Sequence, residues 1–456
     1  MADTIAAVST GWGISAIGII RLSGDTAIET AERVFRPLNG RKLSELPDRL
    51  LVLGELLAED GAVLDRCLCT VSRGPSSYTG EDTAEIQCHG SPVVLSEGLK
   101  SLFRAGARQA LAGEFTRRAF LNGLLDLTQA EAVIDLIDAE TAEGAKNAAG
   151  QLGGAVSRRT DRIYDALLDM TAHFQAVIDY PDEDIEDFRL REYLDTFHSS
   201  EEELKRLLST FERGSLLRTG VPTAIIGRPN AGKSSLLNAM VGYERAIVTA
   251  REGTTRDTIE ERVRIGGSVL RLTDTAGIRP TEDEAERLGV ERARRAAEDA
   301  SLVLAVFDGS RPVSDEDREV AERASRAEGR IAVVNKSDLP AAFDEELLAG
   351  RFDGVVHVSA LTGDGIDSLA EQIGRVIGPL PQAGQGEILT NARQAEAVSR
   401  ALEAITAARE AAEDGVTPDA VLTGVEEAMA ALGELTGKTV RDDVVTRIFE
   451  RFCVGK

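Results

Sequence analysis

The chain has 456 residues and a formal net charge of −25, from 52 Lys and Arg against 77 Asp and Glu. This length allows two or three domains with substantial cores, and the acidic balance excludes a generally basic nucleic-acid surface, so contact with RNA would need a local basic patch or a basic partner. The four cysteines form no CxxC pair or zinc spacing, no apolar run is long enough to span a membrane, and the start of the chain lacks a basic signal-peptide region, so we expect a cytoplasmic protein in a reducing compartment.

Residues 1–118 mix short β-rich runs with helical periodicity, which predicts one α+β domain. The run at 67–71 is expected to pair with the run at 50–57 across the Asp60–Gly61 turn. The other elements expected here are strands at 14–22 and 83–88 and a helix at 93–103.

Residues 119–217 are expected to form a helical domain segment. Apolar residues such as Ile163 and Leu167 recur at helical spacing, and few helix breakers occur before Tyr180–Pro181. The acidic run 182–187 is interpreted as a solvated loop, with a metal site as the alternative. Residues 214–222 are interpreted as a short linker.

A nucleotide-binding domain is predicted for residues 218–380. The apolar run 221–226 leads directly into Gly-Arg-Pro-Asn-Ala-Gly-Lys-Ser-Ser at 227–235. This is the strand–loop–helix opening of a P-loop, in which backbone N–H groups and a helix N-terminus near Ser235 bind phosphates. Lys233 would supply a cation to the β- and γ-phosphates, and Ser234 a hydroxyl to Mg²⁺. The nucleotide-contacting positions expected here are Asn230, Ala231, Gly232, Lys233, Ser234 and Ser235.

The segment that follows is a candidate for a switch loop. It contains the run Gly-Thr-Thr-Arg-Asp, in which the hydroxyl of Thr255 can bind Mg²⁺ when the γ-phosphate is present. The alternative is a simple Thr-rich turn. The expected nucleotide contacts are Thr249, Ala250, Arg251, Glu252, Gly253, Thr254 and Thr255.

Three further motifs each follow an apolar run, at 269–272, 331–334 and 355–358. A doubly wound sheet binds its ligand at the carboxyl ends of its strands, so these motifs are expected to meet at the P-loop. Together they predict that the chain binds and hydrolyses GTP. The residues are Asp274, Thr275, Ala276 and Gly277, then Asn335, Lys336, Ser337 and Asp338, and finally Ser359, Ala360 and Leu361.

Asp338 indicates the choice of base. A carboxylate only accepts hydrogen bonds, so it can take both donors on the N1–H and N2–H₂ edge of guanine. Adenine lacks that pair and would leave the charge unsatisfied, at a cost of roughly 1–3 kcal/mol or more. The alternative is a solvated loop aspartate with no ligand.

Hydrolysis of GTP needs a residue that orients the attacking water, and the position that usually supplies it does not do so in this chain. Ras-like GTPases place a water-orienting Gln directly after the motif at 274–277, whereas this chain has Ile278. Asn230, with carbonyl groups of the 249–254 loop, can hold a monovalent cation against the phosphates, in the role of an arginine finger. Glu286 is the candidate for orienting water; the alternative is that it faces solvent.

Residues 381–456 return to Ala- and Glu-rich helical periodicity. Their expected partner is the segment 119–217, which would make the nucleotide domain an insertion in a discontinuous helical domain. Such insertions are tolerated where the ends of the inserted domain lie close together.

Beyond the nucleotide motifs, the chain resembles the MnmE (TrmE) family of tRNA-modification GTPases along its whole length. The most specific marks are outside the nucleotide domain. They are Gly-Ile-Ile-Arg-Leu-Ser-Gly at 18–24, Tyr-Thr-Gly-Glu-Asp at 78–82, Gly-Glu-Phe-Thr-Arg-Arg-Ala-Phe-Leu-Asn-Gly at 113–123, and the terminal Phe-Cys-Val-Gly-Lys at 452–456.

The resemblance implies an α/β and α+β multidomain fold. Residues 1–118 would form an aminomethyltransferase-like, folate-binding domain that dimerises the protein, 119–217 and 381–456 the two helical segments, and 218–380 a Ras-like G domain activated by K⁺. With an FAD-dependent partner of the MnmG/GidA type, forming a heterotetramer, the homodimer would install an aminomethyl or carboxymethylaminomethyl group on wobble uridine of certain tRNAs. The one-carbon carrier would be 5-formyl- or 5,10-methylene-tetrahydrofolate.

The resemblance also implies roles for single residues. Arg21 and Glu85 would contact the folate, and Lys456 would lie near it. Asn230, Thr249, Arg251 and Thr254 would coordinate K⁺, Ser234 and Thr255 would bind Mg²⁺, and Glu286 would orient the hydrolytic water. Cys453 matches the family's functional thiol, with a buried structural cysteine as the alternative.

Two residues depart from the family pattern. Leu124 stands where family members often carry Lys, which removes a side-chain contact to folate but not a backbone one. Glu252 adds a negative charge to the cation loop, where small residues are usual.

Two alternatives to the modification enzyme stay open. One is a regulatory GTPase switch in ribosome or RNA assembly, although such proteins typically append a basic RNA-binding module. The other is a folate-dependent one-carbon transferase with a purely regulatory G domain.

Overall fold

The computed structural model describes residues 3–179, 190–243, 261–272, 300–378, 386–439 and 442–456. The candidate residues at 249–255, 274–277 and 286 lie outside these ranges, as does the acidic run 182–187. The chain divides into two compact units. The first unit contains residues 1–134, 151–201 and 400–456, and the second unit contains residues 135–150 and 202–399.

The first unit contains a mixed sheet. In the described part of the chain its seven strands run in the order β3-β4-β5-β6-β2-β1-β7, antiparallel except for the β1–β7 pair. The predicted strands and the β4–β5 hairpin are confirmed. The strands are β1 (Ile5–Val8), β2 (Ser15–Ser23), β3 (Phe35–Pro37), β4 (Val52–Leu57), β5 (Val63–Ser72), β6 (Thr83–Gly90) and β7 (Arg108–Gln109).

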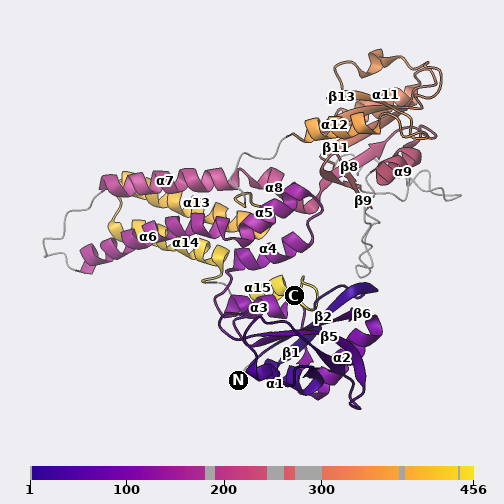
Figure 1. The fold of residues 1–456 in the computed structure, drawn as a ribbon. Helices are drawn as coiled ribbons and strands as arrows, with labels where there is room; N and C mark the ends of the chain where they lie inside the picture. Colours follow the sequence, from indigo (N-terminus) through magenta and orange to yellow (C-terminus); the bar gives the residue numbers. More distant parts are fainter. Residues whose placement is uncertain (1–2, 180–189, 244–260, 273–299, 379–385, 440–441) are drawn as a thin grey trace. The chain divides into compact units, whose positions relative to one another are not determined.

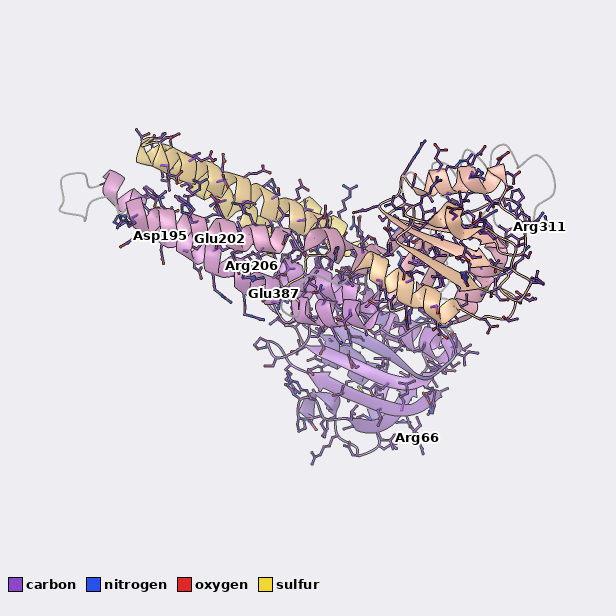
Figure 2. All side chains as sticks on the ribbon, turned by 90° about the horizontal axis from the view of Figure 1, so that it is seen from above. Arg66, Asp195, Glu202, Arg206, Arg311 and Glu387 are labelled. Atoms are coloured by element: carbon purple, nitrogen blue, oxygen red, sulfur yellow. The ribbon has the colours of Figure 1, made fainter. Side chains whose placement is uncertain are left out.

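The sequence patterns did not reveal β1. All its residues are buried, so it lacks the alternation of apolar and polar residues that marks a half-buried strand. On β5, by contrast, Arg66 faces solvent (Figure 2), while its neighbour Cys67 is buried.

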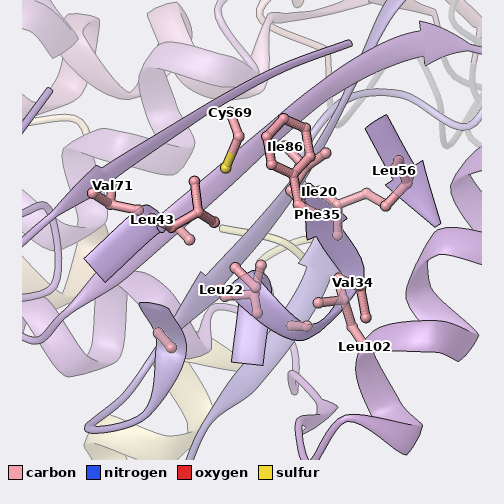
Figure 3. Close-up of a cluster of buried hydrophobic side chains, with 14 of the residues drawn as sticks. Ile20, Leu22, Val34, Phe35, Leu43, Leu56, Cys69, Val71, Ile86 and Leu102 are labelled. Atoms are coloured by element: carbon pink, nitrogen blue, oxygen red, sulfur yellow. The ribbon is translucent and has the colours of Figure 1, made fainter. Parts of the chain in front are cut away.

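Helices α1 (Ala27–Val34) and α2 (Pro92–Arg104) pack against one face of this sheet and enclose its core. The core includes Ile20, Leu22, Phe35, Leu56 and Ile86 (Figure 3). Three cysteines belong to the same core, and burial raises the pKa of Cys67 to about 12 and that of Cys88 to about 11. The pKa of Cys69 is raised in the same way. These thiols therefore act as apolar core residues, and no metal-binding cluster of His, Cys, Asp or Glu occurs among the described residues.

The rest of the first unit is helical. Helix α14 packs along α6, so the C-terminal segment contacts the earlier helical segment (Figure 1). Phe174 of α6 stacks on Tyr193 at 4.9 Å between ring centroids, and Arg409 pairs with Glu201 at 2.6 Å. The helices are α3 (Glu114–Leu121), α6 (Ala155–Asp179), α14 (Pro418–Thr436) and α15 (Asp442–Phe449), with parts of α4 (Leu127–Ile137), α7 (Leu190–Leu208) and α13 (Ala392–Glu413). A short 3₁₀ turn, η1 (Leu43–Glu45), precedes β4.

The second unit contains a mostly parallel sheet. Its six described strands run in the order β13-β12-β11-β8-β10-β9, with only β9 antiparallel among them. The predicted strands are confirmed, and β11 is an additional central strand. The strands are β8 (Val221–Ile226), β9 (Glu261–Ile265), β10 (Ser268–Leu272), β11 (Leu302–Asp308), β12 (Gly329–Asn335) and β13 (Gly354–Val358).

Apolar cores lie on both faces of this sheet, as in a doubly wound fold. Helices α9 (Lys233–Tyr243) and α12 (Ile366–Ile377) contribute Leu236 and Leu369 to one core, and α11 (Asp315–Ala324) contributes Val320 to the other. The remaining elements are α5 (Ala142–Leu152), α8 (Phe211–Thr219) and the 3₁₀ turn η3 (Glu345–Leu348).

The predicted linker at 214–222 is wrong. Helix α8 covers its first part, and β8 begins at Val221. A Cβ on Gly214 would lie 2.2 Å from the carbonyl oxygen of Leu389, whose own N–H donates to Thr210 Oγ1 at 3.0 Å. Gly214 is therefore needed for close packing inside a helix, which local sequence does not distinguish from a glycine in a linker.

Candidate functional site

The P-loop joins β8 to α9 in the second unit and owes its shape to tight backbone contacts. Asn230 and Gly232 have positive φ values of 60° and 97°. A Cβ on Gly232 would lie 2.1 Å from Asn335 Nδ2, and one on Gly227 would lie 2.5 Å from the carbonyl oxygen of Val306. The loop therefore requires these glycines, and α9 begins at Lys233, slightly before the expected position.

Lys233 is held inside this loop. Its Nζ donates to the carbonyl oxygens of Gly227 at 2.8 Å and Arg228 at 2.9 Å. Burial lowers the pKa of this ammonium, because a low-dielectric surrounding disfavours the charged form. Among the described residues no carboxylate pairs with this ammonium, and a phosphate at the loop would supply that anion, so the residues fit a nucleotide phosphate site.

Asn335 connects the P-loop to the other described motifs. Its Nδ2 donates to the carbonyl oxygen of Ala231 at 3.0 Å, and its Oδ1 accepts from the N–H groups of Lys336 at 2.8 Å and Ala360 at 3.0 Å. An amide side chain can both donate and accept, so this one residue ties together three loops at the carboxyl ends of β8, β12 and β13.

Asp338 is fixed by the neighbouring motif. Ser359 Oγ donates to its Oδ1 at 2.6 Å, and the N–H of Ser337 donates to the carbonyl oxygen of Val358 at 3.1 Å. The motifs at 230–235, 335–338 and 359–361 thus meet at one end of the sheet, as predicted for a guanine-nucleotide site.

Two acidic residues of this site were missed by sequence analysis. Asp308 ends β11 and accepts from Lys336 Nζ at 2.7 Å. Asp317, at the first turn of α11, is buried and lies 3.4 Å from Nε of Arg228 in the P-loop. The available signals were the apolar run before Asp308 and the Ser314-x-x-Asp317 capping pattern, which is a complete capping box in the structure.

In the first unit, Arg21 and Glu85 lie opposite each other on β2 and β6 and form an ion pair at 2.8 Å. The Arg21 guanidinium lies 5.3 Å from the centroid of the Tyr78 ring and 5.7 Å from that of Phe115. The N–H of Phe115 donates to the carbonyl oxygen of Lys456 at 3.1 Å. The candidate residues Arg21, Glu85 and Lys456 are therefore brought to one region, beside aromatic rings that can stack on a planar ligand.

The other marked residues of this unit form a buried polar network. Arg118 donates to Glu81 at 2.8 Å and pairs with Glu114 at 3.0 Å. Ser23 Oγ lies 2.7 Å from both Thr79 Oγ1 and Glu81 Oε2. These residues come from the blocks at 18–24, 78–82 and 113–123, which therefore serve at least in part to hold the domain together.

Three residues were singled out for uncertain or altered roles; Cys453 and Leu124 are accessible, and Glu252 lies outside the described residues. Cys453 is exposed, while its carbonyl oxygen accepts from the N–H of Gly113 at 3.3 Å. This excludes the alternative of a buried structural thiol. Leu124 is 41% exposed.

Within the described ranges no helix is long and apolar enough to cross a membrane.

Comparison with known proteins covers both units. The family model described as the GTP-binding protein TrmE N-terminus matches residues 4–124, and the model of the MnmE helical domain matches residues 127–453. A protein named tRNA modification GTPase MnmE from Symbiobacterium thermophilum is 44% identical, with 100% of this chain and 99% of that protein aligned. The chain belongs to the MnmE family. MnmE proteins from Roseiflexus sp. and Alkaliphilus metalliredigens are 42% and 40% identical with the same coverage.

Among solved structures, the G domain of the T. maritima FeoB iron transporter aligns to 34% of this chain and 98% of its own, with 25% identity and a TM-score of 0.26. The assignment to the MnmE family depends on the full-length relatives and the family models, not on this likeness.

Proposed function

We propose that this chain is a GTP hydrolase that acts in tRNA modification. The observation that supports this most is the Asn335 side chain, which joins the P-loop, the 335–338 loop and the 359–361 loop into one site. The same chain belongs to a family whose relatives are named tRNA modification GTPases over their full length.

Nucleotide binding and hydrolysis are tested on the purified full chain. We expect GTP but not ATP to be hydrolysed, and Asp338→Ala to lose guanine-nucleotide binding by about tenfold or more, because the N1–H and N2–H₂ donors of guanine then lack their acceptor. Equal use of ATP and GTP would contradict a guanine site.

The place in tRNA modification is tested in cells. Deletion of the gene should remove the C5 modification of wobble uridine, and the wild-type gene should restore it. Normal modification together with a ribosome-assembly defect would favour the regulatory switch instead.

We also propose the finer chemistry of hydrolysis. Asn230, Thr249, Arg251 and Thr254 would hold K⁺, and Ser234 and Thr255 would hold Mg²⁺. Bound K⁺ would supply the positive charge that a Ras-like site obtains from an arginine finger. Glu286, in place of the glutamine missing at Ile278, would orient water. Equal hydrolysis in K⁺ and Na⁺, or unchanged turnover of Glu286→Ala, would contradict this proposal.

For the first unit we propose a folate site around Arg21 and Glu85, near Lys456. The ion pair offers a cation for a carboxylate and an acceptor for ring N–H groups, and the neighbouring rings of Tyr78 and Phe115 suit a planar pterin. Calorimetry with 5-formyl-tetrahydrofolate should detect binding to the wild type that Arg21→Ala removes.

The proposed assembly is a homodimer that joins an FAD-dependent partner of the MnmG/GidA type and acts on tRNA. In this layout residues 1–118 dimerise, 119–217 and 381–456 form the helical domain, and 218–380 form the inserted G domain. Cys453 would act in the modification step. Light scattering of the chain alone and with the partner tests the assembly, and Cys453→Ser tests the thiol through the modification level.

A further inference from the structure

The loop expected to recognise guanine, residues 335–338, is anchored by a carboxylate that belongs to none of the nucleotide motifs. Asp308 is the last residue of β11 and lies opposite Asn335 in the register with β12. Lys336 Nζ donates to Asp308 Oδ2 at 2.7 Å. Asp308 Oδ1 accepts from Ser310 Oγ at 2.6 Å and from the N–H of Ser310 at 3.1 Å. Both carboxylate oxygens are thus occupied, one of them by the loop.

This carboxylate is buried but charged. Only 3% of the Asp308 side chain is exposed, against 30% for Lys336. Burial alone raises the pKa of Asp308, but hydrogen bonds from Lys336 and Ser310 outweigh it and hold the pKa below its usual value. At neutral pH the pair is therefore an ion pair with one end embedded in the domain, which is less screened than a surface pair.

Lys336 needs such an anchor because of its backbone. Its φ of 66° lies in the left-handed region, which is unfavourable for a residue with a Cβ and persists only where surrounding contacts impose it. Two of these contacts are made by Lys336 itself: its N–H donates to Asn335 Oδ1, and its Nζ donates to Asp308. In the third, the N–H of Gly309 donates to the carbonyl oxygen of Asn335 at 2.8 Å. The conformation of Lys336 in turn sets the direction in which the chain leads to Asp338.

We propose that Asp308 is a positioning residue for guanine recognition: by holding Lys336, it sets the loop so that Asp338 meets the N1–H and N2–H₂ edge of the base. This inference rests on the proposed guanine-nucleotide site. Asp308 acts through Lys336 and makes no contact with the nucleotide itself.

The test compares GDP with IDP on the full chain by calorimetry. Inosine lacks the exocyclic 2-amino group, so the ratio of IDP to GDP dissociation constants measures how well Asp338 accepts from the N2–H₂ group of guanine. Asp308→Asn keeps the shape and an acceptor for Ser310 but removes the charge that holds Lys336. We expect GDP binding to weaken about tenfold and the ratio to fall, as expected for loss of a charge-assisted hydrogen bond.

Arg311→Ala is the matched control. Its Nε lies 3.8 Å from Asp308 Oδ2, but its side chain is 67% exposed and projects from the surface of the second unit (Figure 2). This variant removes a cation next to the same carboxylate and leaves the Lys336 bond, so both GDP affinity and the ratio should match the wild type.

Lys336→Gln removes the same ion pair by changing its more exposed partner. This variant is measured in place of Asp308→Asn if the latter does not fold. The double variant should be no weaker for GDP than Lys336→Gln alone, because both changes break one interaction. The inference would be overturned, with the guanine site left intact, if Asp308→Asn weakened the binding of GDP and IDP by the same factor. Additive effects of the two substitutions on GDP affinity in the double variant would overturn it as well. A wild type that does not distinguish GDP from IDP would instead overturn the proposed use of Asp338.

Discussion

At the scale of single residues, the nucleotide site is built from polar side chains that hold one another. Asn335 bonds to both the P-loop and the 359–361 loop, Asp338 accepts from Ser359, and Lys336 bonds to Asp308. Each of these groups limits the orientations of its neighbour, so less ordering is left to occur when a nucleotide binds. The same logic applies to the polar network of the first unit, where it serves stability.

Arg118 is the centre of that network. Its side chain is 10% exposed and pairs with Glu81 and Glu114, which are 13% and 9% exposed. Arg118→Met would remove the cation paired with Glu81 and one of the two arginines paired with Glu114, so we expect a loss of about 3–5 kcal/mol in the free energy of unfolding. Chemical denaturation followed by circular dichroism measures the change.

The control for this variant is Lys100→Met. Lys100 pairs with Glu97 at 2.8 Å, but both side chains are well exposed, and an exposed pair contributes about 0–1 kcal/mol. Equal effects of the two substitutions would contradict a structural role for the network.

Glu114 makes the stability of the first unit sensitive to acid. Burial alone raises its pKa, but hydrogen bonds from Arg108, the Leu111 N–H and Arg118 outweigh it, so the pKa lies below the ordinary value of 4.5. A carboxyl group whose pKa is lower in the folded state stabilises the fold at any pH above its unfolded-state pKa. That stabilisation is lost as the pH falls through the folded-state pKa. Thermal unfolding midpoints should therefore drop as the pH falls below 4.5, and drop less steeply in Glu114→Gln.

At the scale of elements, two helices of the second unit each contain a glycine, but only one of these glycines is needed for packing. A Cβ added to Gly214 in α8 would lie 2.2 Å from the carbonyl oxygen of Leu389, whereas one added to Gly242 in α9 would meet nothing within 4 Å.

The strand ends also depend on their neighbours. Strands β8, β12 and β13 can be located from their apolar runs, but the contacts between their loops depend on the order of strands in the sheet.

Gly214→Ala should destabilise the chain by about 1–3 kcal/mol, because the added methyl group overpacks the α8 contact. Gly242→Ala is the matched control and should be neutral or stabilising by up to about 1 kcal/mol, since alanine favours a helix. Thermal unfolding of both variants decides the comparison. A neutral Gly214→Ala would support the linker interpretation that the structure contradicts.

At the scale of the whole molecule, the last residues of the chain complete the N-terminal domain within the first unit. Ser9 Oγ donates to the carbonyl oxygen of Gly455 at 2.9 Å, and the N–H of Phe115 donates to the carbonyl oxygen of Lys456 at 3.1 Å. Phe115, whose ring lies 5.7 Å from the Arg21 guanidinium, is thus bonded to residue 456, a contact that local sequence analysis cannot show.

Gly455→Ala tests this docking. Gly455 has a φ of 102°, and a Cβ there would lie 2.1 Å from the carbonyl oxygen of Val8. The substitution should release the terminal segment and speed hydrogen exchange at the Phe115 amide about tenfold or more, because that amide loses its acceptor. Gly123→Ala, where a Cβ would meet nothing within 4 Å and φ is also positive at 71°, controls for backbone strain alone.

Local signals in the sequence were enough to predict most of the strands and the nucleotide motifs. Apolar runs, helical periodicity and the P-loop glycines are local signals, so they located β8, β12, β13 and the pattern of a guanine-nucleotide site. The order of motifs likewise predicted that they meet, because parallel strands share one ligand-binding edge.

The side chains that hold these motifs in place could be identified only from the folded chain. Asp308 and Lys336 are 28 positions apart, and Arg118 and Glu81 are 37 apart. Such pairs depend on strand register and on helices packing across a sheet, and a single sequence records neither. For the same reason it could not identify β1, whose residues are buried throughout, or reveal that Gly214 lies in a packed helix.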